Sequence, residues 1–526
     1  MIAGKVIYLA SIGINLGPMS ALSSTVLPPS IILTDSEAHL FSFLSKVAES
    51  ALESASTTTP IVLRVAGGWV RDKVLGLDSD DIDIALDTIS GVAFAELCCS
   101  YLTSTSTSTS ASSPSSTPAS PNTQQQDKKK KPKFATIQSN PSQSKHLETA
   151  TMNLFNYSID FTNLRTETYS DSTGRIPQIS FGTPEEDASR RDFTVNSLFY
   201  NITTSSLEDY TSGISDLKSG IIRTPLSPKL TFLDDPLRVL RGIRFSSRFN
   251  FTLSPSLITS IKDPEVRLAL STKVSKERVG KELSGCFKTP ESGYQAFKLL
   301  TSLNLDEVIF TCPTGLTLSS SILPHVSRYV TVSSVSVRLL LMSSILLPNG
   351  RDVFEELQKN GRTYKSRSKV HYCVRDGIKW KSNDANDVQM LVEGVDEAVG
   401  LLKGGGRLEG GMFLRKFKEL WRTGLALGAV KILDGGGEVE GMYEETVERI
   451  QGYNLEGCWK AKPLVDGKGL QEVLGLGKGP EVGKWMKKVV EFMLVNEKGT
   501  KEECVEWLKK CKEQDMLEDK DDDIKV

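Results

Sequence analysis

The pattern of hydrophobic and polar positions predicts that the chain begins with a mixed α/β unit. Apolar residues near helical spacing over residues 36–55 predict an amphipathic helix, and the apolar run 61–66 predicts a buried strand. Two glycines interrupt that run, and a short helix is expected over residues 69–75. Carboxylates then alternate with apolar residues over 81–86, which is typical of a half-buried strand.

Farther along the chain, the pattern predicts helices rather than strands. Two more strands are predicted at 151–154 and 158–161, but after Asp187 the periodicity becomes helical and stays so. Helical spacing is clearest over residues 237–249, 274–287 and 334–346. The predicted fold class is therefore α+β, with a head that contains a sheet followed by an all-helical remainder.

The composition is that of a globular protein large enough for several domains. The chain has 526 residues, of which 39% are hydrophobic and 24% are charged, and its net charge is -2. Any contact with nucleic acid would therefore depend on local basic patches. Eight cysteines form no CxxC pair and four histidines show no zinc spacing, which favours a reduced intracellular compartment. No stretch is long and apolar enough to span a bilayer, so no membrane association is expected.

Two segments are unsuited to a packed core. Residues 102–133 are rich in Ser, Thr and Pro and end in a lysine run, which predicts a disordered insertion. Its lysines fit a solvated linker, and the alternative is RNA contact or nuclear localisation. Residues 1–34 carry a single charge, Lys5, and are expected to be a flexible leader or a targeting segment, with Met19 as an alternative start.

The strongest chemical signal lies around the first two predicted strands. Asp81 and Asp83 are two residues apart on a strand, so both side chains project from one face. Such a pair is unfavourable unless a cation lies between the charges, and Mg²⁺ is commonly held by one or two carboxylates with substrate phosphates. Gly67 and Gly68 would let backbone amides approach a triphosphate, and Arg71 would supply a cation. The alternative is a glycine turn followed by a solvated acidic strand.

These residues resemble motif A of the nucleotidyltransferase superfamily with polymerase-beta-like heads. The match is best to the class II tRNA nucleotidyltransferases and their bacterial poly(A) polymerase relatives. The resemblance implies that Asp81 and Asp83 are catalytic and hold two Mg²⁺ ions, which would activate a hydroxyl and stabilise a leaving oxygen. It also implies a third strand carboxylate, for which Asp160 is the candidate; the alternative is an ordinary strand acid.

A second block resembles motif B of that family and consists of Arg190, Arg191, Asp192, Asn196 and Ser197. The family pattern is RRDxxxNA, and Ser197 stands where the family has alanine. Two adjacent arginines suit contacts with a triphosphate or ribose. Asp192 and Asn196 are expected to share one helix face, which would contact the ribose of a bound nucleotide. Taken alone, the block would fit a helix-terminal Asp with exposed arginines.

A third block, Asp235 with Arg238, Arg241 and Arg244, resembles motif D, which in the family acts as an amino-acid template for the incoming base. Asp235 could accept a hydrogen bond from an exocyclic amine while Arg238 donates to a ring acceptor. Cytosine and adenine offer this pair of groups, whereas guanine and uracil would leave buried groups unpaired. The resemblance places Arg241 and Arg244 at positions that contact the nucleotide. The alternative is a capped helix with Pro236 in its first turn and a basic face.

Weaker signals accompany these three blocks. Asp209, Gly213, Asp216 and Gly220 resemble motif C, which links head and neck, and residues 275–283 resemble motif E, expected to be an ion-paired bracing helix.

Three C-terminal segments could contact RNA. Residues 462–467 and 474–480 look like the tail of eukaryotic and organellar members, although helix termination explains their glycines as well. The basic stretch 362–369 fits an RNA surface or, more commonly, a solvated helix face.

Together these features predict an enzyme that adds CMP, CMP and AMP from CTP and ATP to the tRNA 3′ end. An A-adding or poly(A) polymerase-type enzyme stays open, as does a catalytically silent RNA-binding scaffold. No obligatory protein partner is expected. The expected compartments are cytoplasm and nucleus, with mitochondrion or plastid reached through the leader. The predicted domains are the leader (1–34), a polymerase-beta-like head (35–205), a neck with the base-template helix (206–290), a helical body and tail for tRNA binding (291–500) and a charged C-terminal tail (501–526).

Overall fold

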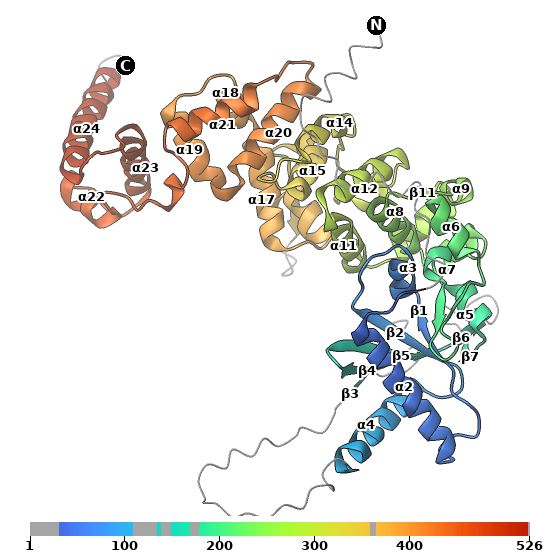
Figure 1. Ribbon diagram of the computed structural model, residues 1–526. Helices are drawn as coiled ribbons and strands as arrows, with labels where there is room; N and C mark the ends of the chain where they lie inside the picture. The colour runs from blue at the N-terminus through green and yellow to red at the C-terminus, as the bar shows by residue number, and fades with distance from the viewer. Residues whose placement is uncertain (1–30, 109–133, 138–148, 169–177, 358–363, 524–526) are drawn as a thin grey trace, which may run out of the picture. The chain divides into compact units, whose positions relative to one another are not determined.

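The computed structural model divides the chain into two compact units (Figure 1). Unit 1 is Met1–Lys273 and unit 2 is Val274–Val526. The structure describes residues 31–108, 134–137, 149–168, 178–357 and 364–523. The division falls inside the predicted neck, and the finer separation into neck, body and tail stays a prediction. Most of the predicted leader and of the predicted insertion lies outside the described residues.

A seven-stranded mixed sheet forms the centre of unit 1, in the order β3-β4-β5-β2-β1-β8-β9. The strands are β1 (Leu63–Ala66), β2 (Asp81–Leu86), β3 (Phe134–Ile137), β4 (Thr149–Leu154), β5 (Tyr157–Asn163), β8 (Phe199–Asn201) and β9 (Ser206–Glu208). Strands β2 and β5 are parallel, and the other neighbours are antiparallel. The four strands predicted from the sequence are confirmed.

The prediction of uninterrupted helix after Asp187 is wrong, because β8 and β9 complete the sheet. Strand β8 has only three residues, all of them buried, so it is too short to display an alternating pattern. One of its partners is β1, more than a hundred residues earlier in the chain, and the other is β9, which also has only three residues. The distant pairing leaves no local signal, and the local one is too short to give a clear pattern.

Three N-terminal helices complete the part of unit 1 that carries the first motif: α2 (Asp35–Glu53), α3 (Gly68–Val74) and α4 (Gly91–Ser108). Helix α4 packs on strands β4 and β5, and α2 lies against α4. Figure 1 shows α2 and α4 beside the sheet. Because α4 runs to Ser108, the predicted insertion is helical at its beginning, which corrects the boundary near residue 102. Thr103 and Thr105 there donate hydrogen bonds to carbonyls four residues earlier in the helix.

The remaining elements of unit 1 follow the fifth strand. They are β6 (Arg165–Thr168), β7 (Gln178–Phe181), α5 (Pro184–Arg190), η3 (Thr194–Asn196), α6 (Gly213–Ser219), β10 (Ile221–Ile222), α7 (Pro228–Asp234), α8 (Arg238–Phe249), β11 (Thr252–Leu253), α9 (Pro255–Ile261) and α10 (Pro264–Lys273). Strands β6 and β7 form an antiparallel hairpin, and β10 pairs with β11 in parallel. The predicted helix over 237–249 is confirmed as α8.

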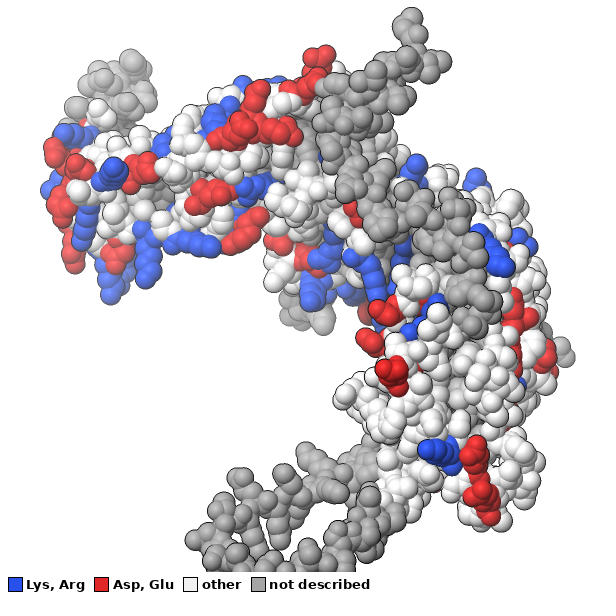
Figure 2. Space-filling model, viewed as in Figure 1, with Lys and Arg blue, Asp and Glu red and all other residues white. Residues whose placement is uncertain are grey.

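Unit 2 is mostly helical. Its elements are α11 (Lys276–Gly285), η4 (Cys286–Lys288), α12 (Pro290–Ser302), α13 (Asp306–Ile309), α14 (Leu323–Val326), η5 (Ser327–Tyr329), α15 (Val337–Leu346), η6 (Leu347–Asn349), β12 (Val353–Leu357), β13 (Tyr364–Ser368), α16 (Lys369–Tyr372), η7 (Cys373–Gly377), α17 (Ser382–Glu393), α18 (Val395–Leu402), α19 (Arg407–Phe417), η8 (Lys418–Leu420), α20 (Trp421–Asp434), α21 (Met442–Gly452), η9 (Cys458–Lys460), α22 (Gly467–Leu474), α23 (Pro480–Val495) and α24 (Lys501–Asp523). Basic and acidic side chains are interspersed on the visible face of its C-terminal helices (Figure 2). None of the described helices is long and apolar enough to cross a membrane.

A β-hairpin interrupts the helices of unit 2, so the prediction of an all-helical remainder is corrected. Strands β12 and β13 pair in antiparallel register, and the basic stretch around Arg367 lies on β13 rather than on a helix. Arg367 pairs with Glu356 at 2.7 Å and also with Asp376, and Lys369 lies 3.6 Å from Asp352. These cations neutralise neighbouring carboxylates, which makes them less suited to an RNA surface.

Glu37 of α2 holds helix α3, which follows the glycine pair of the first motif, in place. Its carboxylate is buried and accepts a hydrogen bond from Trp69 Nε1 at 3.1 Å, and it pairs with Lys73 at 2.9 Å. Its second oxygen accepts the Thr34 backbone N–H at 2.8 Å, which completes a capping box on α2. One carboxylate therefore ties the start of α2 to two residues of α3.

We expect Glu37→Ala to destabilise the protein by about 3 kcal/mol, because the largely buried Lys73 ammonium would lose its partner. Glu49→Ala is the matched control, since Glu49 lies on the same helix but is exposed, and its loss should change stability by less than about 0.5 kcal/mol. Urea unfolding of both variants measures the difference. Equal stability of the two variants would contradict the assigned role of Glu37.

Candidate active site

Three carboxylates lie together on the neighbouring strands β2 and β5. The parallel register places Asp83 directly beside Asp160, and Asp81 lies two residues earlier on the same face of β2. Asp160 Oδ1 accepts a hydrogen bond from Thr151 Oγ1 of β4 at 2.6 Å. Burial, together with the charges of Asp81 and Asp160, raises the pKa of Asp83 to about 6, while Arg191 opposes the shift.

This arrangement brings negative charges together, and a bound cation would reduce the repulsion between them. Within the described ranges, no group of three or more His, Cys, Asp or Glu side chains could hold a metal ion by itself. An ion bound by these carboxylates would therefore need further ligands from a substrate phosphate or from water. Magnesium is commonly bound in that way, so the donor set fits Mg²⁺.

The glycine turn between β1 and α3 lies close to the arginines of the second motif. Gly67 has φ +74°, and a Cβ on it would lie 2.9 Å from Arg191 Nη1. The Gly67 N–H donates to the Leu198 carbonyl at 2.9 Å, which links the end of β1 to the segment before β8. At Gly68, the nearest atom to an added Cβ is Arg71 Nη2 at 3.7 Å. Glycine at position 67 is thus favoured by the backbone conformation, and a side chain there would oblige the Arg191 guanidinium to shift.

Arg71 is almost fully buried, with 4% of its surface exposed. Its guanidinium donates to Asp72 at 2.8 Å and to Asn196 Oδ1 at 2.5 Å. It also lies over the rings of Phe249 and Phe245 of α8, at 4.7 and 5.2 Å from their centroids. These contacts hold α3, η3 and α8 together, and the phosphate contact expected of Arg71 stays a prediction.

Asp192 and Asn196 meet, although not on the helix face expected from their spacing. Helix α5 ends at Arg190, and Asn196 closes the short 3₁₀ turn η3. Asn196 Nδ2 donates to Asp192 Oδ1 at 3.0 Å, and Arg241 Nε donates to Asp192 Oδ2 at 2.7 Å. Burial opposes ionisation of Asp192, but the charge of Arg241 and the hydrogen bond from Asn196 hold its pKa below the usual value.

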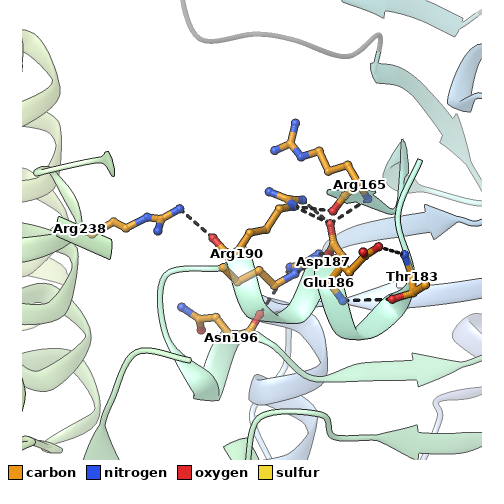
Figure 3. Close-up of polar contacts among 8 residues, drawn as sticks. Arg165, Thr183, Glu186, Asp187, Arg190, Asn196 and Arg238 are labelled. Atoms are coloured by element: carbon orange, nitrogen blue, oxygen red, sulfur yellow. Dashed lines mark hydrogen bonds and ion pairs between the residues drawn. The ribbon is translucent and has the colours of Figure 1, made fainter. Parts of the chain in front are cut away.

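The third motif joins the end of α7 to the start of α8. Helix α8 begins at Arg238, so Pro236 precedes the helix and does not form its first turn. Asp235 Oδ1 accepts the backbone N–H of Leu237 at 3.2 Å, and Arg238 Nη2 donates to the backbone carbonyl of Arg190 at 2.9 Å (Figure 3). The Arg238 side chain is thereby directed toward the second motif.

Arg241 and Arg244 follow on the same helix. Arg241 pairs with Asp192, whereas the Arg244 guanidinium lies over the Phe245 ring at 4.3 Å. The structure therefore brings Arg238 and Arg241 to the second motif and packs Arg244 on an aromatic ring.

Motif C braces the second motif. The Asp209 carboxylate accepts the N–H groups of Gly213 and Ile214 at 2.9 and 3.0 Å, which caps the start of α6. Within α6, Asp216 Oδ2 accepts a hydrogen bond from Thr194 Oγ1 of η3 at 2.6 Å. The expected structural role of this block is therefore supported by its contacts.

Motif E forms α11 in unit 2. Ser275 caps the helix by accepting the Arg278 N–H at 3.4 Å, and Trp380 Nε1 donates to the Gly280 carbonyl at 3.3 Å. A Cβ at Gly280 would lie 1.9 Å from the Ile378 carbonyl oxygen, so this close approach requires glycine.

Asp187 of α5 is a residue of the site to which the motifs assigned no role. Its buried carboxylate accepts hydrogen bonds from Nε of Arg190 and from Nε of Arg191, both at 2.9 Å (Figure 3). The available signal was its spacing, because an acid three and four residues before two arginines faces both of them on a helix.

The fold and these side chains define a nucleotidyltransferase. Residues 63–223 match the family described as the poly A polymerase head domain. The chain is 33% identical to a tRNA nucleotidyltransferase of Schizosaccharomyces pombe, over 92% of this chain and 99% of that protein. It is also 33% identical to the mitochondrial CCA tRNA nucleotidyltransferase of Saccharomyces cerevisiae, over 91% of this chain and 94% of that protein.

The chain therefore belongs to the tRNA nucleotidyltransferase family. An apo structure of a CCA-adding enzyme has the same fold, with a TM-score of 0.59, 18% identity and coverage of 93% of this chain and 98% of that one. Nucleotidyltransferases of this family generally use divalent metal ions.

We expect Gly67→Ala to lower nucleotidyl transfer at least about tenfold, because its methyl group would displace the Arg191 guanidinium. Gly76→Ala is the control: Gly76 has a similar positive φ of +71°, but nothing lies within 4 Å of its added Cβ. Both variants carry the same backbone strain of about 1–2 kcal/mol. Initial rates of nucleotide incorporation distinguish them, and equal rates would show that the Arg191 contact is unimportant.

Proposed function

We propose that this chain adds CMP, CMP and AMP, from CTP and ATP, to the 3′ end of tRNA without a nucleic-acid template. The observation that carries the proposal is the set of carboxylates Asp81, Asp83 and Asp160 on adjacent parallel strands. The names of relatives that match over nearly their full length support tRNA as the substrate. In the reaction, the tRNA 3′-hydroxyl attacks the α-phosphorus of the nucleotide and pyrophosphate leaves.

Asp81 and Asp83 are proposed to hold Mg²⁺ in a two-metal site, with Asp160 as the third catalytic carboxylate. When bound, the ions supply charge neutralisation at the attacking and leaving oxygens. The raised pKa of Asp83 supports this assignment, because clustered carboxylates on partly buried strands favour a bound cation. Thr151 fixes the Asp160 carboxyl group by its hydrogen bond, so its orientation is set before substrate arrives.

The arginines are proposed to bind the nucleotide. Arg190 and Arg191 would contact the triphosphate, beside the turn formed by Gly67 and Gly68. Asp192, Asn196 and Arg71 form the buried chain of hydrogen bonds that supports them.

The base would be read by Asp235 and Arg238, with Arg241 and Arg244 beside them on α8. An amine donor next to a ring acceptor is common to cytosine and adenine, so one pocket would accept both bases. The contact between Arg238 and the Arg190 carbonyl supports this geometry, because it joins the base-reading residue to the triphosphate arginines.

We further propose that the remainder of the neck, body and tail binds tRNA through shape and phosphate contacts. The proposed compartments are cytoplasm and nucleus, with mitochondrion or plastid reached through residues 1–34. Support for an organelle comes from the relatives whose names include "mitochondrial".

One alternative has specific support, and the carboxylates argue against a second. The head domain is shared with poly(A) polymerases, so an A-adding enzyme would have the same carboxylates and arginines. A silent RNA-binding scaffold would retain the fold, but would have no selective reason to keep three repelling carboxylates on adjacent strands.

The test is nucleotide incorporation on tRNA lacking its last three nucleotides, with Mg²⁺ and with each labelled nucleoside triphosphate singly and in pairs. We expect two C residues, then one A, then arrest. Long A tails would favour the poly(A) alternative, and RNA binding without incorporation would favour the scaffold. Asp81→Ala should abolish incorporation, whereas Asp80→Ala, which removes an exposed neighbouring charge outside β2, should not. Full activity of Asp81→Ala would refute the metal assignment.

Arg238→Ala should weaken discrimination of C and A against G and U by about tenfold or more, because a donor to the ring acceptor is lost. Arg248→Ala is the control on the same helix, since Arg248 pairs with Asp72 at 3.8 Å and contacts no group proposed to read the base. Misincorporation ratios measured with single nucleotides give the comparison. Unchanged fidelity of Arg238→Ala would exclude a template role for this arginine.

A further inference from the structure

Asp187 lies where two arginines of the proposed triphosphate site converge. It is on α5, three residues before Arg190 and four before Arg191, and only 1% of its surface is exposed. Its two oxygens are divided between the guanidinium groups: Oδ1 faces Arg190, and Oδ2 accepts from Nε and pairs with Nη2 of Arg191 at 2.9 and 2.8 Å. The backbone N–H of Arg165 is 3.4 Å from Oδ1.

The charge balance explains why a carboxylate is needed there. Burial opposes ionisation of Asp187, but Arg191 and Arg190 together hold its pKa below the usual value. Burial also lowers the pKa of Arg190 to about 10, so this guanidinium stays charged at neutral pH. Without the carboxylate, two like charges would face each other in a largely buried position, which is strongly unfavourable.

Arg190 and Arg191, both paired with Asp187, also contact residues of the other motifs. The Arg191 Nη1 group lies beside Gly67 and 3.5 Å from the Asn196 carbonyl, and the charge of Arg191 acts on Asp83. The backbone carbonyl of Arg190 accepts the hydrogen bond from Arg238. Both guanidinium groups remain partly accessible, with 19% and 21% of the side chains exposed.

We propose that Asp187 is a positioning residue that holds Arg190 and Arg191 in the orientation required to bind the triphosphate of the incoming nucleotide. This inference rests on the proposed function of the two arginines. Asp187 itself would touch neither nucleotide nor metal. Its side-on pairing uses the Nε edge of each guanidinium and fixes the direction of both planes, which a single-point contact would not do.

The first test compares Asp187→Asn with Glu185→Gln. Both substitutions remove one negative charge from the first turns of α5 at constant side-chain shape, but Glu185 is exposed and is not among the partners of Asp187. We expect Asp187→Asn to raise KM for CTP roughly tenfold or more, because an amide offers one acceptor to two cations. Its kcat should change much less, and Glu185→Gln should match the wild type in both constants.

A binding measurement distinguishes a specific loss of triphosphate contacts from general damage to the nucleotide site. We expect Asp187→Asn to weaken binding of inorganic tripolyphosphate by the same factor as KM for CTP, while the affinity for CMP stays at the wild-type level. A folded Asp187→Asn protein with unchanged KM for CTP, or with equal losses for CMP and tripolyphosphate, would overturn the proposal. Absence of incorporation by the wild-type protein would instead refute the proposed function, and the tripolyphosphate comparison would still decide the role of Asp187.

A double-substitution series covers the case in which Asp187→Asn does not fold alone. Arg191→Ala removes one of the two cations, so Asp187→Asn in that background removes the carboxylate that orients Arg190. We expect the added substitution to raise KM for CTP further, through Arg190. In the Arg190→Ala/Arg191→Ala background the same substitution should have no further effect. Any other pattern, such as an unchanged KM in the first background or an equal increase in both, would contradict the proposal.

Discussion

The parallel pairing of β2 with β5 is the constraint around which unit 1 is arranged. It places Asp83 beside Asp160 and keeps Asp81 on the same face, so three like charges are held together on two central strands of the sheet. Neighbouring carboxylates repel one another, and the raised pKa of Asp83 is the measure of that repulsion together with burial. A fold that retains this arrangement must stabilise it elsewhere, and Arg191 supplies an opposing charge.

The stabilisation comes from a series of arginines, each shared between a carboxylate and another group. Arg71 joins Asp72 to Asn196, and Arg241 holds Asp192. Breaking a buried pair of this kind typically costs about 3–5 kcal/mol, because the remaining charge is left without a partner. The same contacts fix the directions of the side chains before any substrate binds, and such pre-organisation is what transfer of a nucleotide requires. Stability and the proposed chemistry of the site therefore depend on the same ion pairs.

The sequence could predict the elements whose signals are local. In helices α2 and α8 and strands β2 and β5, hydrophobic residues recur at a clear period, and the positions of these elements were expected from it. Strand β8 and the hairpin β12–β13 were missed, because short strands are stabilised by pairing with partners and leave little pattern of their own. Asp187 had no role assigned from the sequence, although its helical spacing from Arg190 and Arg191 is a local signal, because spacing alone does not show that both arginines share one buried carboxylate.

By itself, the sequence determined which chemical groups this protein has and which segments carry them: the carboxylates at 81 and 83, the paired arginines and the basic helix that begins at Arg238. These follow from residue identity and spacing along the chain, which are local properties. Only the tertiary structure decided which groups meet. The register that sets Asp83 against Asp160 and the burial of Arg71 between α3 and α8 both depend on segments distant in the chain. Such contacts form only when the whole unit excludes water, so no local pattern specifies them.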